Sequence, residues 1–251
     1  MITRLDQALV TRGLCPSREQ AKRAILAGQV RVNEQLARKP SDPVRPDDTL
    51  GLETPERYVS RGGHKLEHAL KTFMLDVTGW RVVDFGASTG GFTDCLLQHG
   101  ALKVYAVDVG HGQLAWRLRR DPRVEVMERV NARYLTPAGF AQPYEPVEAV
   151  VMDCSFISLK KLLPPAVALI EPAGRILALV KPQFEAGKRE ADRGAGVIRD
   201  AAVHGRVLDE LNAFVQRELP LRWLGVTESP LRGPAGNLEY FVLLEKISRQ
   251  N

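Results

Sequence analysis

Short apolar runs recur through the last three quarters of the chain, separated by longer segments of mixed polarity. The runs lie at residues 81–85, 103–107, 148–152 and 174–180, and each has the length of a buried strand. Strands that alternate with segments long enough for helices indicate a mostly parallel sheet with helices on both faces. The pattern therefore predicts an α/β fold.

The strongest helical pattern spans residues 200–219. Six apolar residues fall on one side of it: Val203, Val207, Leu208, Leu211, Phe214 and Val215. A shorter helix is expected in "RGGHKLEHALKTF", ahead of the first strand. After the long helix, "LRWLGVT" and "EYFVLLEK" are joined by a connector rich in glycine and proline. This arrangement predicts a closing antiparallel pair of strands.

The first 39 residues have a different character. Leu5, Ala8 and Leu9 have helical spacing, and Ser17 can cap a second helix whose apolar face we expect to be Ala21, Ala24, Ile25 and Leu26. "QVRVNEQ" then alternates like a short strand before a turn. Residues 40–56 are rich in proline and aspartate, which is typical of a connector. We therefore expect a small α+β domain over 1–59 and a larger domain over 60–251.

Basic charge is concentrated in the first 39 residues. Residues 1–39 hold eight basic and three acidic residues, an excess of five that equals the formal net charge of the whole chain. Such an excess suits a polyanion such as RNA, although a solvated face without a ligand remains the alternative. The basic residues expected to bind RNA are Arg4, Arg18, Lys22, Arg23 and Arg31.

Other classes of protein find little support in the sequence. The cysteines and histidines form no metal-ligand pattern, so we expect no metal and no disulfide framework. The amino terminus lacks the apolar core of a signal peptide, and no run approaches the ~20 apolar residues of a membrane helix. The sequence favours a cytoplasmic protein without a membrane partner, and it does not indicate an oligomeric state.

The stretch "VVDFGASTGGFTDCLL" is a predicted strand, a glycine turn and the start of a helix. The turn, with Gly86 and Gly90, has neither the G-x-G-x-x-G spacing of a dinucleotide site nor the lysine of a P-loop. A ligand with an adenosine group but no phosphate therefore fits better, and S-adenosylmethionine is the common one. The alternative is a turn that packs on glycines for structural reasons alone.

Polar residues at the ends of neighbouring strands fit the same ligand. Asp108 ends the next predicted strand, where a carboxylate can accept hydrogen bonds from both ribose hydroxyls. Asn131 is expected to meet the adenine edge, and either Asp84 or Ser88 the methionine portion.

The segment after the predicted strand at 148–152, Asp153-Cys154-Ser155-Phe156, bears on the methyl acceptor. It lacks the prolines of the turn that commonly accompanies amine methylation. Carbon methylation of cytosine needs a cysteine nucleophile, and Cys154 is well placed for that role, but a small buried residue is the commoner interpretation.

A hydroxyl acceptor must lose its proton as it attacks the methyl group. Lys181 and Asp153 follow parallel strands at one edge of the sheet, Glu239 begins a strand that faces this edge, and Lys65 opens the helix before the first strand. Two lysines and two carboxylates could thus converge on one ribose hydroxyl. Because lysine has an ordinary pKa of about 10.4, a base role for Lys181 requires desolvation or nearby positive charge.

With these residues in view, the sequence resembles the TlyA family, the haemolysin-A-like ribosomal RNA ribose methyltransferases. The segments that carry the resemblance are "RLDQALVTRGLCPSREQAKRAILAGQVRVN", "YVSRGGHKL", "DFGASTGGFTDCLL", "VDVGHGQLAW", "DCSFISL", "LVKPQFE" and "GNLEYF". The resemblance implies an S-four-like RNA-binding domain and an FtsJ-like S-adenosylmethionine-dependent domain, which has the Rossmann-like fold of a class I methyltransferase with a mostly parallel seven-stranded sheet and helices on both faces. It also implies a catalytic tetrad that falls on Lys65, Asp153, Lys181 and Glu239.

The resemblance also implies a substrate, the 2'-hydroxyl of cytidine in ribosomal RNA, free or within ribosomal subunits. The short extensions at both ends are similar to those of the shorter members, which favours a large-subunit site, with a small-subunit site possible. Two rivals remain: an RNA-binding assembly factor with an inactive methyltransferase fold, and a membrane-active haemolysin. For the second, the helix at 200–219 is the only candidate segment, and its apolar face is needed to cover the sheet.

Overall fold

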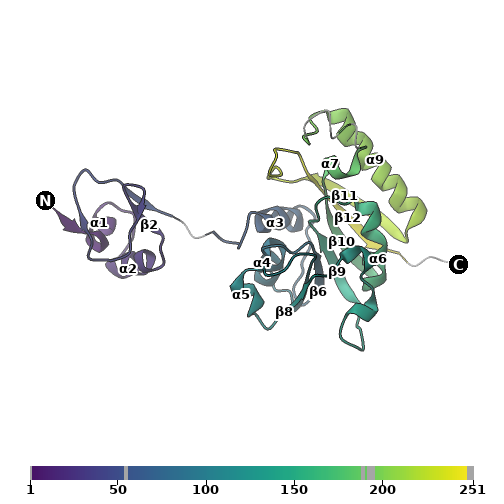
Figure 1. The fold of residues 1–251 in the computed structure, drawn as a ribbon, viewed down its shortest axis with the longest axis horizontal. Helices are drawn as coiled ribbons and strands as arrows, with labels where there is room; N and C mark the ends of the chain where they lie inside the picture. The colour runs from purple at the N-terminus through teal and green to yellow at the C-terminus, as the bar shows by residue number, and fades with distance from the viewer. Residues whose placement is uncertain (1, 54–55, 188–189, 191–195, 248–251) are drawn as a thin grey trace. The chain divides into compact units, whose positions relative to one another are not determined.

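The computed structural model describes residues 2–53, 56–187, 190 and 196–247. The chain forms two compact units, residues 1–57 and 58–251 (Figure 1). We call them the amino-terminal unit and the sheet unit, and each is described by itself.

The amino-terminal unit combines two helices with two small antiparallel sheets. Its helices are α1 (Leu5–Thr11) and α2 (Arg18–Leu26). Strands β1 (Thr3–Arg4) and β4 (Pro43–Val44) form one sheet. The other sheet has the order β3 (Gln35–Leu36), β2 (Val30–Val32) and β5 (Leu50–Leu52).

Local sequence explains these elements. Ser17 caps α2, because its hydroxyl oxygen accepts a hydrogen bond from Gln20 N at 3.3 Å. Asn33 and Glu34 both have positive φ, which makes the tight turn between β2 and β3. The prediction for the apolar face of α2 was wrong at one position, since Leu26 is 73% exposed. It lies about 100° around the helix from the buried Ile25, on the solvent side.

The sheet unit is built on seven strands. They are β6 (Arg81–Phe85), β7 (Lys103–Asp108), β8 (Val124–Glu128), β9 (Val147–Met152), β10 (Ile170–Val180), β11 (Leu221–Glu228) and β12 (Tyr240–Lys246). Their order is β11-β12-β10-β9-β6-β7-β8, and only β12 runs antiparallel to its neighbours. The predicted fold class and the closing antiparallel pair are thus confirmed.

Helices cover both faces of this sheet (Figure 1). One face carries α3 (Gly62–Thr72), α4 (Gly91–Gln98) and α5 (Trp116–Arg119). The other carries α6 (Leu163–Leu169) and α9 (Ala201–Glu218), with the short helix α7 (Pro182–Glu185) nearby. Short 3-10 turns η1 (Ala132–Tyr134), η2 (Pro137–Gly139) and η3 (Leu159–Lys161) complete the described elements.

The sheet topology brings several strand ends to one edge. Strands β6, β7, β9 and β10 are parallel, so their carboxyl ends lie together. Strand β12 starts at this edge, because its first residue, Tyr240, pairs with Val180, the last residue of β10. Glu239 and Lys181 therefore leave the sheet side by side, as the sequence predicted.

Candidate active site

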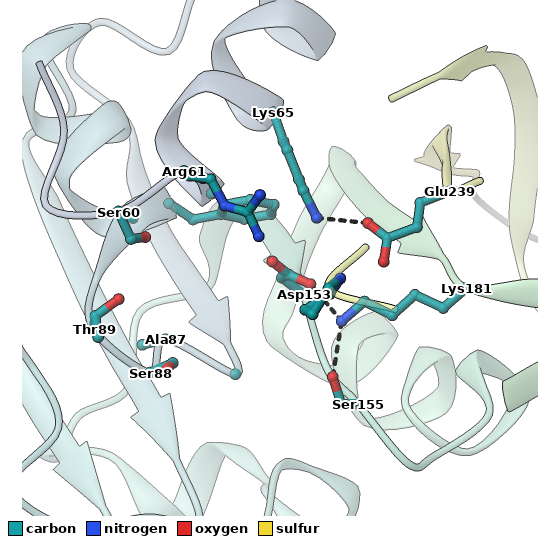
Figure 2. Close-up of a pocket in the computed structure, with 15 residues that line it drawn as sticks. Ser60, Arg61, Lys65, Ala87, Ser88, Thr89, Asp153, Ser155, Lys181 and Glu239 are labelled. Atoms are coloured by element: carbon teal, nitrogen blue, oxygen red, sulfur yellow. Dashed lines mark hydrogen bonds and ion pairs between the residues drawn. The ribbon is translucent and has the colours of Figure 1, made fainter. Parts of the chain in front are cut away.

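A pocket of about 300 Å³ lies at this edge of the sheet, and we call it the tetrad pocket (Figure 2). Its walls come from the start of α3, the turn after β6, the ends of β9 and β10, and the loop before β12. All four residues predicted as a tetrad line it: Lys65, Asp153, Lys181 and Glu239. Four segments distant in sequence thus meet in one cavity.

The four side chains form two ion pairs that face each other across the pocket (Figure 2). Lys65 Nζ donates to Glu239 Oε2 at 2.5 Å, and the two side chains are only 9% and 1% exposed. The loop before β12 fixes Glu239, whose carbonyl oxygen accepts a hydrogen bond from Ser229 N at 2.8 Å. This pair is buried on both sides, so neither charge can lose its partner without cost.

The second pair is more open. Lys181 Nζ lies 2.7 Å from Asp153 Oδ1, with side chains 10% and 23% exposed. The contact lacks the angles of a hydrogen bond, and Asp153 Oδ1 has no hydrogen-bond partner among the described residues. Lys181 Nζ also donates to Ser155 Oγ at 2.9 Å. Because an ammonium group has three N–H bonds, at least one remains available to a ligand in the pocket.

A second pocket, of about 580 Å³, adjoins the tetrad pocket. The two share Gly86, Ser88, Asp153 and Ser155 in their walls. The rest of the second pocket combines apolar side chains with a few polar ones: Val107, Asp108, Val109, Gln113, Val130, Asn131, Ala132, Cys154, Phe156, Ile157 and Leu162. Two ligands bound in these pockets would meet at the shared wall.

Backbone geometry keeps the floor of both pockets open at Gly86. This residue has φ of +83°, and a Cβ there would lie 3.0 Å from Asp153 O and 3.1 Å from Cys154 Sγ. A side chain would therefore be strained and would crowd the wall that the two pockets share. The close approach of the chain after β9 thus requires glycine here, in a turn that lines both pockets.

Asp108 and Asn131 line the second pocket, as expected of ligand-binding residues. Asp108 accepts hydrogen bonds from Ser88 N at 2.8 Å and from Gly110 N at 2.7 Å, which fixes its carboxylate. Each oxygen keeps a further lone pair for a ligand hydroxyl. Asn131 Oδ1 accepts from Arg133 N at 3.0 Å, which leaves its amide N–H groups for a ligand.

Two predicted ligand-binding residues have other positions. Asp84 is fully buried, lines neither pocket, and accepts a hydrogen bond from Thr93 Oγ1 at 2.7 Å. Side chains alternate along β6, so Asp84 points to the opposite face from Val83 and Phe85, toward α4. Of the two residues predicted to contact the methionine portion, only Ser88 lines a pocket. Gly90 lines neither pocket either: it has φ of +96°, and a Cβ there would meet Leu118.

The environment of Asp84 alters its ionisation. Burial raises the pKa of this carboxyl to about 7, although the Thr93 hydrogen bond acts in the opposite direction. Its second oxygen has no hydrogen-bond partner among the described residues. Asp84 is therefore a partly protonated group beneath the site.

Cys154 lines the second pocket, but its thiol is not activated. Burial raises its pKa to about 12, and the nearby carboxylates of Asp84 and Asp153 add to the effect. The thiolate is the nucleophilic form of cysteine, and it is scarce at neutral pH when the pKa is that high. The geometry thus argues against a covalent cysteine mechanism.

Sequence reasoning missed several residues that line the tetrad pocket. Ser155 contacts Lys181, while Ser60, Arg61 and Thr89 form the opposite wall (Figure 2). Arg61 directly precedes α3, whose first turn carries Lys65. The only sequence signal for these residues was that each adjoins a predicted strand end or the helix bearing Lys65.

The predicted RNA-binding residues of the amino-terminal unit are mostly paired with acids. Arg4 and Arg18 both contact the buried Asp6, at 3.1 and 2.9 Å. Arg23 pairs with Glu19 and Arg31 with Glu53, whereas Lys22 is exposed and takes part in none of the ion pairs found among the described residues. Burial raises the pKa of Asp6, but hydrogen bonds from Arg18 and Arg4 outweigh it and lower that pKa overall. Arg18 thus also has a structural role.

The fold and the paired pockets are those of a methyltransferase. The chain belongs to the FtsJ-like methyltransferase family, whose model matches residues 58–246, and an S4 domain model matches residues 3–50. The predicted family resemblance is confirmed.

Several named relatives are similar over nearly the whole chain. YqxC of Bacillus subtilis, which has a provisional designation as an rRNA methyltransferase, is 50% identical over 96% of this chain and 85% of its own length. The 16S/23S rRNA (cytidine-2'-O)-methyltransferase TlyA of Mycobacterium tuberculosis is 48% identical over 96% of this chain and 89% of its own. Hemolysin A of Brachyspira hyodysenteriae is 38% identical over 94% of this chain and 97% of its own.

A solved structure from Streptococcus thermophilus, provisionally designated a hemolysin, is also similar to this chain. It is 42% identical with a TM-score of 0.74, covering 98% of this chain and 89% of that one. A methyltransferase from Listeria monocytogenes, described as S-adenosylmethionine dependent, shares the fold alone, at 16% identity with a TM-score of 0.54 over 75% of this chain and all of that one.

Proposed function

We propose that this protein transfers a methyl group from S-adenosylmethionine to the 2'-hydroxyl of a cytidine in ribosomal RNA, acting in the cytoplasm. The observation that carries the proposal is the convergence of two lysine–carboxylate pairs in a pocket that shares a wall with a second, partly apolar pocket. The names of the relatives support the substrate.

The residues of the second pocket fit S-adenosylmethionine. Asp108 has free lone pairs for the ribose hydroxyls, and Asn131 has amide N–H groups for the adenine edge. Val107, Val130 and Leu162 offer apolar walls for the adenine ring, and Ser88 adjoins the tetrad pocket for the methionine portion. When bound, the cofactor supplies an electrophilic methyl group on a positively charged sulfur.

The tetrad would bind and activate the acceptor hydroxyl. Asp153 and Ser155 hold the Lys181 ammonium from two directions, so that a remaining N–H can contact the ribose oxygen. In a base role, Lys181 would accept the proton that the ribose hydroxyl loses as it attacks the methyl group. The buried Lys65–Glu239 pair would keep the opposite wall rigid.

Substrate recognition would be divided between the two units. The first 39 residues, most of which belong to the S4 domain, carry an excess of five basic residues, which suits binding to phosphates without strict sequence preference. Selection of one nucleotide requires a base that is unpaired or turned out of its stack, because the ribose must enter the tetrad pocket. We favour the large ribosomal subunit and keep the small subunit as a second candidate.

The rival functions have less support. Among the described helices, none is long and apolar enough to cross a membrane. In α9, Val207, Leu211 and Val215 are buried against the sheet, so this helix has no free apolar face for a lipid surface. An inactive assembly factor would not need Lys181 held at an open pocket.

The test uses purified protein, S-adenosylmethionine with a labelled methyl group, and unmodified large and small ribosomal subunits, each assayed separately. We expect label in large-subunit RNA with wild-type protein and none with Lys181→Ala. Binding of S-adenosylhomocysteine to both proteins is the control for an intact second pocket. Cofactor binding by the wild type without label in either subunit would contradict the proposed reaction.

A further inference from the structure

An exposed tryptophan lies in the connection after β7, next in sequence to a residue that is hydrogen-bonded to the wall of the tetrad pocket. Trp116 begins α5, in the connection that follows the carboxyl end of β7, and its residue surface is 70% exposed. Tryptophan is usually well buried, because its ring is the largest apolar group among the side chains. Single exposed apolar side chains are common on protein surfaces, so the groups around this indole decide whether it belongs to a contact surface.

One arginine lies over this indole, and three more are close to it in sequence. The guanidinium carbon of Arg120 lies 5.9 Å from the centroid of the Trp116 ring. Residues 116–123 contain four arginines and one aspartate. Arg117 pairs with Asp94, Arg119 with Glu128 and Arg123 with Asp121, whereas Arg120 forms no ion pair with any residue that the structure describes. The surface thus combines an aromatic face with a cation available to an anionic partner.

The element that carries Trp116 is held against the pocket wall. Ala115 N donates to Thr89 O at 3.2 Å, and Thr89 lines the tetrad pocket. Leu114 and Leu118 are buried, 6% and 3% exposed, and their side chains approach Gly90 at the start of α4. Trp116 is thus an exposed residue at the start of a short, well-anchored helix, and its neighbour Ala115 is hydrogen-bonded to the wall of the pocket that would receive the ribose.

We propose that Trp116 and Arg120 form a stacking surface for RNA next to the methylated nucleotide. An unstacked base flanking the target would lie on the indole, and Arg120 would contact its phosphate. Single-stranded RNA is commonly recognised in this way, by bases stacked on aromatic rings and arginines. The proposal rests on the proposed function and deepens it, since it assigns part of the substrate contact to the sheet unit.

Kinetics with ribosomal subunits provide the first test. Trp116→Ala is expected to raise KM for the subunit about 5- to 150-fold, the range measured for loss of one base–aromatic stack. The value of kcat and the affinity for S-adenosylhomocysteine should remain unchanged, because the contact is made in the ground state and the transition state alike. Trp116→Phe should restore most of the affinity. The control is Leu102→Ala, since Leu102 is 61% exposed at the amino end of β7, on the opposite edge of the sheet.

Two further measurements separate stacking from charge. Arg120→Ala should reduce the slope of log affinity against log salt by about one phosphate contact, while Trp116→Ala should leave that slope unchanged. In a variant with Trp80→Phe and Trp223→Phe, Trp116 is the only tryptophan left of three. Its fluorescence should be quenched when an rRNA fragment carrying the target is added with S-adenosylhomocysteine.

The outcomes distinguish this proposal from the one it rests on. In one outcome, wild-type protein methylates the subunit, Trp116→Ala has the same KM as Leu102→Ala, and the single-tryptophan variant shows no quenching. The assignment of the stacking surface is then wrong, while the proposed reaction is unaffected. If wild-type protein binds S-adenosylhomocysteine yet methylates no ribosomal RNA, the proposed function fails. A rise in KM together with quenching supports the stacking surface.

Discussion

Replacement of Lys65 by methionine tests whether the buried ion pair holds the site together. The substitution keeps the length and apolar stem of the side chain but removes the charge, which leaves Glu239 with 1% of its side chain exposed and without its cation. Removing one partner of a buried pair costs about 3–5 kcal/mol, because the remaining charge is uncompensated. The melting temperature of a unit of this size should fall by roughly 6–20 °C.

The same helix offers a matched control. Lys71 on α3 pairs with Glu67 at 2.7 Å, but its side chain is 69% exposed. Lys71→Met should therefore cost less than about 1 kcal/mol. The double variant Lys65→Met with Glu239→Gln removes both buried charges and should recover most of the lost stability.

Thermal and urea unfolding of the full chain measure both effects. The relevant transition is the one whose midpoint rises with S-adenosylhomocysteine, because that transition reports the unit with the second pocket. If Lys65→Met loses no more stability than Lys71→Met, or if the double variant is no more stable than Lys65→Met, the pair does not have the structural role we assign to it.

Four further predictions concern other residues. Lys181→Ala should lower methylation at least ~100-fold with unchanged binding of S-adenosylhomocysteine; turnover near the wild-type level in a labelled-methyl assay would contradict its role at the acceptor. Ser155→Ala should lower kcat about 10-fold and leave KM for S-adenosylmethionine unchanged, and Ser155→Thr should restore kcat, because only the hydroxyl that accepts from Lys181 is removed. The raised pKa of Asp84, about 7, means that between pH 4 and 7 the folded state keeps a proton that the unfolded state has lost, so stability should fall by roughly 4 kcal/mol as the pH rises through this window. Asp84→Asn should abolish that fall in denaturant titrations, and an unchanged pH profile would refute the assignment. Lys22→Ala should reduce the salt slope of RNA binding by about one without changing stability, and an equal slope in a filter-binding assay would count against Lys22 as a phosphate contact.

The tetrad could be predicted because each residue adjoins a strand end or a helix start whose position follows from hydrophobic pattern. Strand β12 is an example: its antiparallel direction was predicted, and this direction puts Glu239 at the edge where Lys181 follows β10. Because parallel strands end at the same edge of a sheet, this topology brings four residues that are distant in sequence to one pocket.

Other features depend on contacts that a sequence pattern does not record. Asp84 also lies near the carboxyl end of a strand. Side chains alternate along β6, however, and the Asp84 side chain points into the core. The count of basic residues in the amino-terminal unit did not reveal that Asp6 is shared by Arg4 and Arg18. Ser155 has no distinctive pattern, since a serine after a strand is common and only its distance from Lys181 singles it out.

The secondary structure departs from a simple alternation between β8 and β9. The interval between the predicted strands at 103–107 and 148–152 left room for helices. Between β8 and β9, however, the structure contains only the 3-10 turns η1 and η2. Pro137, Gly139 and Pro143 explain this, because proline and glycine in such close succession prevent a continuous helix. The start of this connection, residues 130–132, lines the second pocket.

The most direct test of the account identifies the atom that receives the methyl group. Ribosomal RNA labelled by the wild-type protein would be digested completely to nucleosides, which mass spectrometry would separate by the position of the methyl group. The account predicts that the label is found in 2'-O-methylcytidine and disappears when Lys181 is replaced by alanine. Label in 5-methylcytidine or in any base-methylated nucleoside would contradict the assignment of the tetrad pocket to a ribose hydroxyl.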